Sequence, residues 1–151
     1  MIRGIRFELP NERENSLERI LDNFDISKLF WRVLFSDTFM RAGSRDDEKH
    51  LKCSDFMGIE FKEIVEKNRN YIIHLGILAF PTESKEEVCD YQTFLNSSAE
   101  FFVAIIDSIL VDIYVKEKGT LELFEKAAQK HGFAETEFFT EENDRFVVWS
   151  G

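Results

Sequence analysis

Residues 101–115 read Phe-Phe-Val-Ala-Ile-Ile, then Asp107-Ser108, then Ile-Leu-Val-Asp-Ile-Tyr-Val. Two apolar, β-branched runs on either side of a polar pair predict a β-hairpin that turns at Asp107 and Ser108. If these two residues alone form the turn, one face is wholly apolar and contains Phe102, Ala104, Ile106, Ile109, Val111, Ile113 and Val115. The other face then contains Phe101, Val103, Ile105, Leu110, Asp112, Tyr114 and Lys116, and becomes polar toward one end. So apolar a hairpin is expected in the covered centre of a sheet.

Segments with the periodicities of helices and strands surround this hairpin. Helices are predicted from a cap at Asn15 to residue 25, around residues 61–68, from a capping box at Ser84 and Glu87, and from a cap at Thr120 to Gly132. Further strands are predicted at residues 5–9, 30–39, 71–80, 135–139 and 145–149, with a charged loop at residues 41–52. The predicted fold class is α+β: a mixed, mostly antiparallel sheet with a central apolar hairpin, packed by about four helices.

Length and composition favour one globular domain over residues 1–151. Sixteen Phe residues supply a large core, so neither a disulfide framework nor a metal is needed for folding. The two Cys residues, Cys53 and Cys89, are expected to be free thiols of a cytoplasmic protein. The first residues read as a strand instead of a signal peptide, and no apolar run has the length of a membrane span.

The formal net charge of −10 argues against binding of nucleic acid, because phosphate groups would be repelled. Such a charge serves solubility in most proteins, but it also suits an acidic face that binds a basic protein partner. The segment from Glu135 to Asp144 contains five acidic residues and is the candidate for that face. Within it Glu141, Glu142 and Asp144 are the candidate partner residues, with an ordinary solvated hairpin as the alternative interpretation.

No motif for catalysis, metal binding or cofactor binding is found. His50-x-x-Cys53 has the spacing of two metal ligands, but no second pair accompanies it, so no metal site is predicted. The sequence lacks Gly-x-Ser-x-Gly and any glycine-rich phosphate loop, so we assign no catalytic residue and no cofactor.

Three residues remain candidates for ligand binding. His74 and Asp112 are polar residues on strands that should lie inside the sheet, and they would form an acid–base pair if they met in one cleft. A hydrogen-bonded core histidine is the competing interpretation of His74. Trp31, like Trp149, could contact a ligand or partner from the surface or could pack in the core.

Several short motifs together resemble a known family: Arg3-Gly4-Ile5, Pro10-Asn11, Ala79-Phe80-Pro81, Phe94-Leu95-Asn96-Ser97, Asp107-Ser108, Gly132-Phe133, Thr140, and Asn143-Asp144-Arg145. The chain resembles, over nearly its whole length, a small family of uncharacterised bacterial proteins known as a domain of unknown function. The resemblance implies a bacterial, cytoplasmic protein and assigns no activity to any residue.

The sequence therefore favours a non-enzymatic acidic interaction module of the adaptor, inhibitor or immunity type. The alternative is a small-molecule-binding domain whose pocket is lined by Phe and Trp and tuned by His74 or Arg32. An enzyme with scattered catalytic groups comes third. A homo-oligomer is compatible with so many phenylalanines, and the sequence leaves the oligomeric state open.

Overall fold

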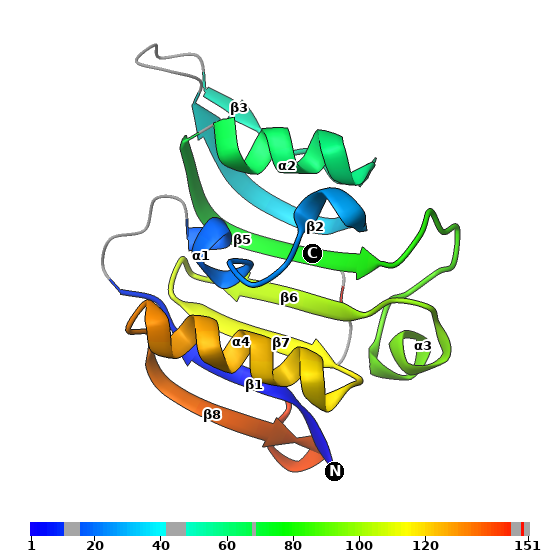
Figure 1. Ribbon diagram of the computed structural model, residues 1–151, viewed down its shortest axis with the longest axis vertical. Coiled ribbons are helices and arrows are strands. Elements are labelled where there is room, and N and C mark those ends of the chain that lie inside the picture. The colour runs from blue at the N-terminus through cyan, green and yellow to red at the C-terminus, as the bar shows by residue number, and fades with distance from the viewer. Residues whose placement is uncertain (11–15, 42–47, 68, 146–148, 150–151) are drawn as a thin grey trace.

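The structure, a computed structural model, describes residues 1–10, 16–41, 48–67, 69–145 and 149. These residues build an eight-stranded sheet whose helices lie mainly on one face (Figure 1). The strands are β1 (Ile2–Glu8), β2 (Phe30–Arg41), β3 (Glu48–His50), β4 (Asp55–Phe56), β5 (Arg69–Phe80), β6 (Phe101–Ile106), β7 (Leu110–Val115) and β8 (Ala134–Thr140). The helices are α1 (Ser16–Ile20), α2 (Gly58–Lys67), α3 (Tyr91–Asn96) and α4 (Lys118–Lys130), with two short 3-10 helices, η1 (Ile26–Lys28) and η2 (Glu141–Asn143).

The predicted α+β class is confirmed, and every pairing between described strands is antiparallel. The strand order is β3-β2-β5-β6-β7-β1-β8, and β4 also pairs with β2. The β6–β7 hairpin lies in the middle of this order, as predicted, because both of its faces are covered by other parts of the chain. Among the described residues, none of the helices combines the length and the apolar character needed to cross a membrane.

The two faces of the sheet carry separate cores. The larger core lies under α1, α2 and α4, which cover one face of the sheet (Figure 1). The second core lies on the opposite face, where Phe94 of α3 and Trp149 pack on the sheet. Trp149 stacks on Phe102 of β6 with ring centroids 4.2 Å apart and an interplanar angle of 9°. Side chains on both faces of the central strands are therefore withdrawn from water.

The register of the hairpin corrects our prediction. Ile106 pairs with Leu110 and Ala104 pairs with Asp112, so Ile109 belongs to the loop together with Asp107 and Ser108. This extra residue exchanges the faces of β7 relative to β6. The wholly apolar face consists of Phe101, Val103, Ile105, Val111, Ile113 and Val115 and carries the larger core. Asp112 and Tyr114 consequently share the second face with Ala104 and Phe102.

The hairpin turn holds two residues in left-handed backbone conformations. Asp107 has φ 53° and Ser108 has φ 67°, and the N–H of Ile109 donates to the carbonyl of Ile106 at 3.2 Å. Positive φ at both central positions is the geometry that Asn-Gly adopts most easily. Ser108 also donates its backbone N–H to the carbonyl of Ile73 at 2.9 Å, so the turn is fixed against β5.

We expect Asp107→Asn combined with Ser108→Gly to raise the free energy of unfolding by about 1 kcal/mol, because left-handed conformations cost other residues more than they cost Gly. The melting temperature should rise by about 2–4 °C in a chain of this size. The control is Thr82→Gly at an exposed position without positive φ, where added chain entropy should lower stability. A lower melting temperature for the double variant would contradict the assignment of the turn.

Helix ends were predicted with mixed success. Gly132 has φ 67°, and the N–H of Phe133 donates to the carbonyl of Ala128 at 2.9 Å, which confirms the predicted C-terminal cap of α4. The predicted cap at Thr120 is wrong, since α4 begins at Lys118. Asn15 lies outside the described residues, as do residues 146–148 of the strand predicted at 145–149. The loop predicted at residues 41–52 contains the short strand β3 in its described part.

The capping box predicted at Ser84 is also wrong, because Arg32 holds that segment in a non-helical conformation. The Arg32 guanidinium donates to the carbonyl of Ser84 at 2.8 Å and to the carbonyl of Glu86. The helix starts later, where the Asp90 side chain accepts from the backbone of Thr93 and Thr93 returns the bond.

Candidate interaction surface

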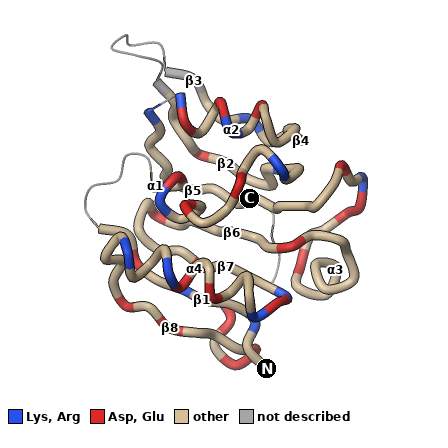
Figure 2. The backbone as a smooth tube through the Cα atoms, in the orientation of Figure 1, with Lys and Arg blue, Asp and Glu red and all other residues tan. Residues whose placement is uncertain are grey.

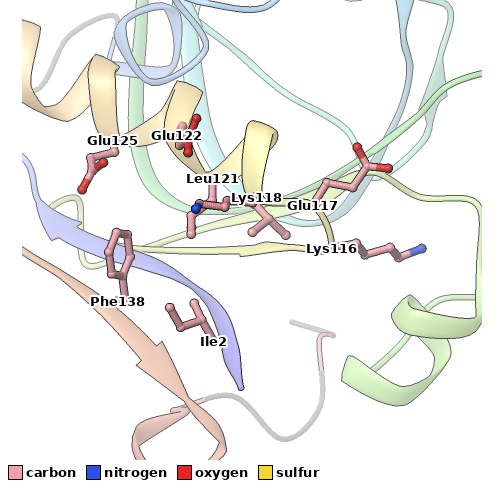
Figure 3. A pocket seen from close by; sticks show the side chains of 9 residues that line it. Ile2, Lys116, Glu117, Lys118, Leu121, Glu122, Glu125 and Phe138 are labelled. Carbon is pink, nitrogen blue, oxygen red and sulfur yellow. The ribbon is translucent and has the colours of Figure 1, made fainter.

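An open groove runs between α4 and the strands β1 and β8 (Figure 3). Its volume is about 460 Å³, and its lining residues are Ile2, Val115, Lys116, Glu117, Lys118, Leu121, Glu122, Glu125 and Phe138. Two large apolar side chains in it are unusually exposed, Ile2 by 45% and Phe138 by 42%. An apolar floor that remains in contact with water, bordered by charged side chains, is typical of interaction sites.

The floor of the groove arises because α4 does not reach the end of the sheet. Phe138 lies opposite Ile5 in the β1–β8 register, and Ile5 belongs to the larger core under the helices. The helix lies over β7 and β1, whereas β8 extends beyond it (Figure 1). Phe138 therefore points to the helix-covered face at a place that α4 leaves uncovered.

The charges around the groove are predominantly acidic. Glu117, Glu122 and Glu125 line it, and no ion pair between described residues neutralises them. Lys116 points away from Ile2 and Phe138 (Figure 3), and its ammonium donates to the carbonyl of Ser97. Burial lowers the pKa of Lys116. Glu117 also points away from Ile2 and Phe138, so the charges nearest to the floor are those of Glu122, Glu125 and Lys118 (Figure 3).

Next to the groove, β8 forms one edge of the sheet. It ends the strand order, so in the described part of the chain no strand pairs with its outer side. Residues 134–138 are all exposed, and acidic residues are spaced along the strand (Figure 2). The opposite border of the sheet differs, because β3 and β4 both pair with β2 there.

On the second face, β1 and β7 are joined by a buried ionic network. Asp112, whose side chain is fully buried, accepts from Arg6 at 3.2 Å and from the Nε of Arg145 at 3.1 Å. A second Arg145 nitrogen bonds the other Asp112 oxygen, so this pair is bidentate. The carboxylate raises the pKa of Arg145 by hydrogen bonding. The two arginines therefore share one fully buried carboxylate, and the buried Nε of Arg6 has no hydrogen-bond partner among the described residues.

Asp144 makes the neighbouring contacts of this network. Its carboxylate accepts from Arg3 at 2.9 Å and from the hydroxyl of Tyr114. Burial, followed by the Asp144 carboxylate, raises the pKa of Tyr114, so this phenol remains the donor. Arg3 in turn lies 4.0 Å above the ring of Tyr91. Together these contacts fix residues 144 and 145 to β1 and β7, and so they hold the segment that follows β8 against the sheet.

The structure separates the residues that were predicted as ligand candidates. Trp31 is fully buried in the larger core, and Asp112 is buried between its arginines. Glu141 and Glu142 are exposed on η2, and Glu141 lies 3.8 Å from Arg3. Asp144 lies in the ionic network instead of at an open acidic edge. Of the predicted segment from Glu135 to Asp144, the part next to the groove is β8.

His74 and Asp112 are not in contact. The strand β6 lies between their strands, and His74 uses Nδ1 to accept the backbone N–H of Asp107 at 3.4 Å. Its Nε2 lies 3.8 Å from the Asp107 carboxylate, at the hairpin turn. Asp112 is already occupied by Arg6 and Arg145, so the described contacts do not assemble an acid–base pair from these two residues.

The described part of the chain contains neither an assembled metal site nor a disulfide. No group of three His, Cys, Asp or Glu side chains there is placed to hold a metal ion. Cys53 and Cys89 are both exposed and unpaired. The ring of His50 packs against that of Phe39 at a tilt of 54°, with ring centroids 4.5 Å apart.

Sequence reasoning missed the groove and the cations that hold Asp112. The signal for Phe138 was present, since an aromatic residue on an acidic edge strand is unusual enough to mark a surface. Nothing in the sequence indicated Arg6 and Arg145 as partners of Asp112, because they lie 106 and 33 residues away. Ile2 was likewise indistinguishable from an ordinary strand residue.

Comparison with known proteins gives a family but no activity. The model of a family described as "Protein of unknown function (DUF2691)" matches residues 2–149. The chain is also similar to "Uncharacterized protein YncE" of Bacillus subtilis (strain 168), with 33% identity over 146 residues, which is 95% of each chain. No solved structure matches the chain.

Proposed function

The chain belongs to the DUF2691 family of proteins of unknown function, and we propose that it is a non-enzymatic acidic interaction module that binds a basic protein partner through the groove between α4 and β8. The observation that carries the proposal is the exposed pair Ile2 and Phe138 on the floor, bordered by Glu117, Glu122 and Glu125. This combination suits a partner segment that presents apolar and basic side chains together.

Electrostatics support the same assignment. A net charge of −10 attracts basic partners over long range and speeds their encounter, while the apolar floor slows dissociation. An adaptor, inhibitor or immunity-type protein needs this kind of surface and no reactive group. The small-molecule alternative has less support, because Trp31 is used in the core and Arg32 holds the segment before α3.

We expect the tagged protein to capture one defined basic protein from cell lysate at about 0.05 M salt and to release it at about 0.5 M, since salt screens exposed charges. The double variant Glu122→Lys, Glu125→Lys and the variant Phe138→Ser should each reduce capture by about tenfold or more. Quantitative mass spectrometry of the eluates measures the loss.

The matched control is Glu83→Lys, Glu87→Lys, which changes the net charge equally on exposed residues between β5 and α3. This control should retain most of the capture, because its charges lie outside the groove. Equal yields from the groove variants and the native protein would refute the proposed surface. Equal losses from both double variants would show that net charge alone attracts the partner.

A further inference from the structure

We propose that the partner binds as an added β-strand along the outer edge of β8, in the residues Thr136–Phe139, with apolar side chains directed into the groove and basic side chains directed to the other face. We call these four residues the docking edge. The inference rests on the proposed function and deepens it, since it names the conformation and the side-chain pattern of the bound segment.

The backbone of the docking edge is available for pairing. The inner side of β8 is bonded to β1, whereas its outer side meets no other described strand. An edge strand presents a row of N–H and C=O groups that an extended peptide can pair with. The edge is limited at both ends: Glu135 has φ 53° within a bulge, and Thr140 caps η2.

The side chains of the docking edge specify the pattern of the added strand. Phe138 faces the helix-covered side, and Glu137 pairs in register with Arg6, which faces the second side. Residues directly opposite each other on paired strands point their side chains to the same face of the sheet. A residue beside Phe138 would therefore extend the apolar floor, and a residue beside Glu137 would meet its carboxylate. The matching segment alternates apolar and basic residues.

The structure offers additional negative charge to such a strand. Glu137 is 58% exposed and lies 3.7 Å from Arg6, and its charge also helps to raise the pKa of Arg145. Arg6 itself is committed to Asp112. Glu122 and Glu125 of α4 line the groove that the added apolar side chains would enter, so they would attract the basic side chains on the other face only over a longer range (Figure 3).

A second copy of the chain is the wrong occupant for this edge. Pairing of two β8 strands would bring glutamates against glutamates between molecules that each carry a charge of −10. An amphipathic helix in the groove would cover Phe138 but would leave the outer backbone groups of β8 without partners from the bound segment. A basic strand satisfies both the backbone groups and the charges.

The test uses three short peptides of alternating valine and lysine. The first is unmodified, and the other two carry N-methyl groups on alternate residues, one set on each edge of the extended peptide. Only one edge of an added strand pairs with β8, so one methylated peptide should retain affinity and the other should lose it by about tenfold or more. A fourth peptide of equal composition with helical spacing serves as the control. Fluorescence anisotropy measures binding, and hydrogen exchange measures protection of the β8 amides.

We expect the unmodified peptide to bind, to protect β8 amides and to lose affinity to Phe138→Ser and to Glu137→Gln, but not to Glu83→Gln. Strand addition is overturned if both methylated peptides bind equally, if the helical peptide binds as tightly, or if no peptide protects β8. The proposed function is tested separately, because capture from lysate by the groove variants does not depend on the conformation of the bound segment.

Discussion

Asp112→Ala is expected to lower the free energy of unfolding by about 3–5 kcal/mol, because it leaves two arginines facing an empty buried position. The loss of Asp112 should destabilise the surroundings of Arg6 more than those of Arg145, because the Arg6 side chain is only 12% exposed and its other carboxylate partner, Glu137, is largely exposed. Arg145 is 41% exposed and can turn toward water. Chemical denaturation of the native and variant proteins measures the difference.

The structure provides two controls for Asp112→Ala. Glu83→Ala removes an exposed carboxylate and should change stability by less than about 0.5 kcal/mol. The triple variant Arg6→Met, Asp112→Leu, Arg145→Met removes the charges together and should be more stable than Asp112→Ala, because no buried charge is left unpaired. If Asp112→Ala were as stable as Glu83→Ala, the buried network would not exist in solution.

Trp31→Ala should destabilise the protein by about 3–5 kcal/mol, the range for loss of a large aromatic side chain from a core. The indole stacks on Phe61 with centroids 4.9 Å apart, and it meets Phe101 edge-on at 5.7 Å. Its Nε1 donates to the carbonyl of Ile26 at 2.9 Å. One side chain thus connects β2, α2, η1 and the central strand β6.

Trp31→Phe separates the packing of the ring from its hydrogen bond. It keeps an aromatic ring in the core and should cost less than Trp31→Ala, with about 0.5–1.5 kcal/mol attributable to the lost hydrogen bond, because the carbonyl of Ile26 still accepts the N–H of Leu29 at 3.3 Å. Partner capture by the folded fraction should be unchanged in both variants, because Trp31 is distant from the surface residues of the groove. A loss of binding without a loss of stability would instead indicate that Trp31 contacts the ligand or partner.

The acidic segment illustrates how far sequence reasoning reached the site. The role of residues 135–144 in binding a partner stays a prediction, and the structure adds that β8, the part of the segment next to the groove, is an edge strand. Asp144 bonds Tyr114 and Arg3 inside the protein, whereas Phe138, which was not among the predicted site residues, is exposed. A carboxylate in a loop and a carboxylate in a buried network look identical in a sequence, because the cations that distinguish them come from distant strands.

The fold could be anticipated to a greater depth than the site. The apolar runs at residues 101–106 and 110–115 fixed the presence and central place of the hairpin, and Gly132 fixed the end of α4, because both signals are local. Composition alone gave the acidic character. These properties belong to neighbouring residues, and the chain carries them before it folds.

Tertiary structure alone decided the register of that hairpin. Both faces of β6 are buried, so the alternation of its side chains offers no contrast between inside and outside from which a register could be read. The additional loop residue Ile109 then placed Asp112 on the second face, within reach of Arg6 and Arg145. The exposure of Phe138 likewise depends on where α4 stops across the sheet. These outcomes follow from contacts between distant segments, which pattern along the chain does not encode.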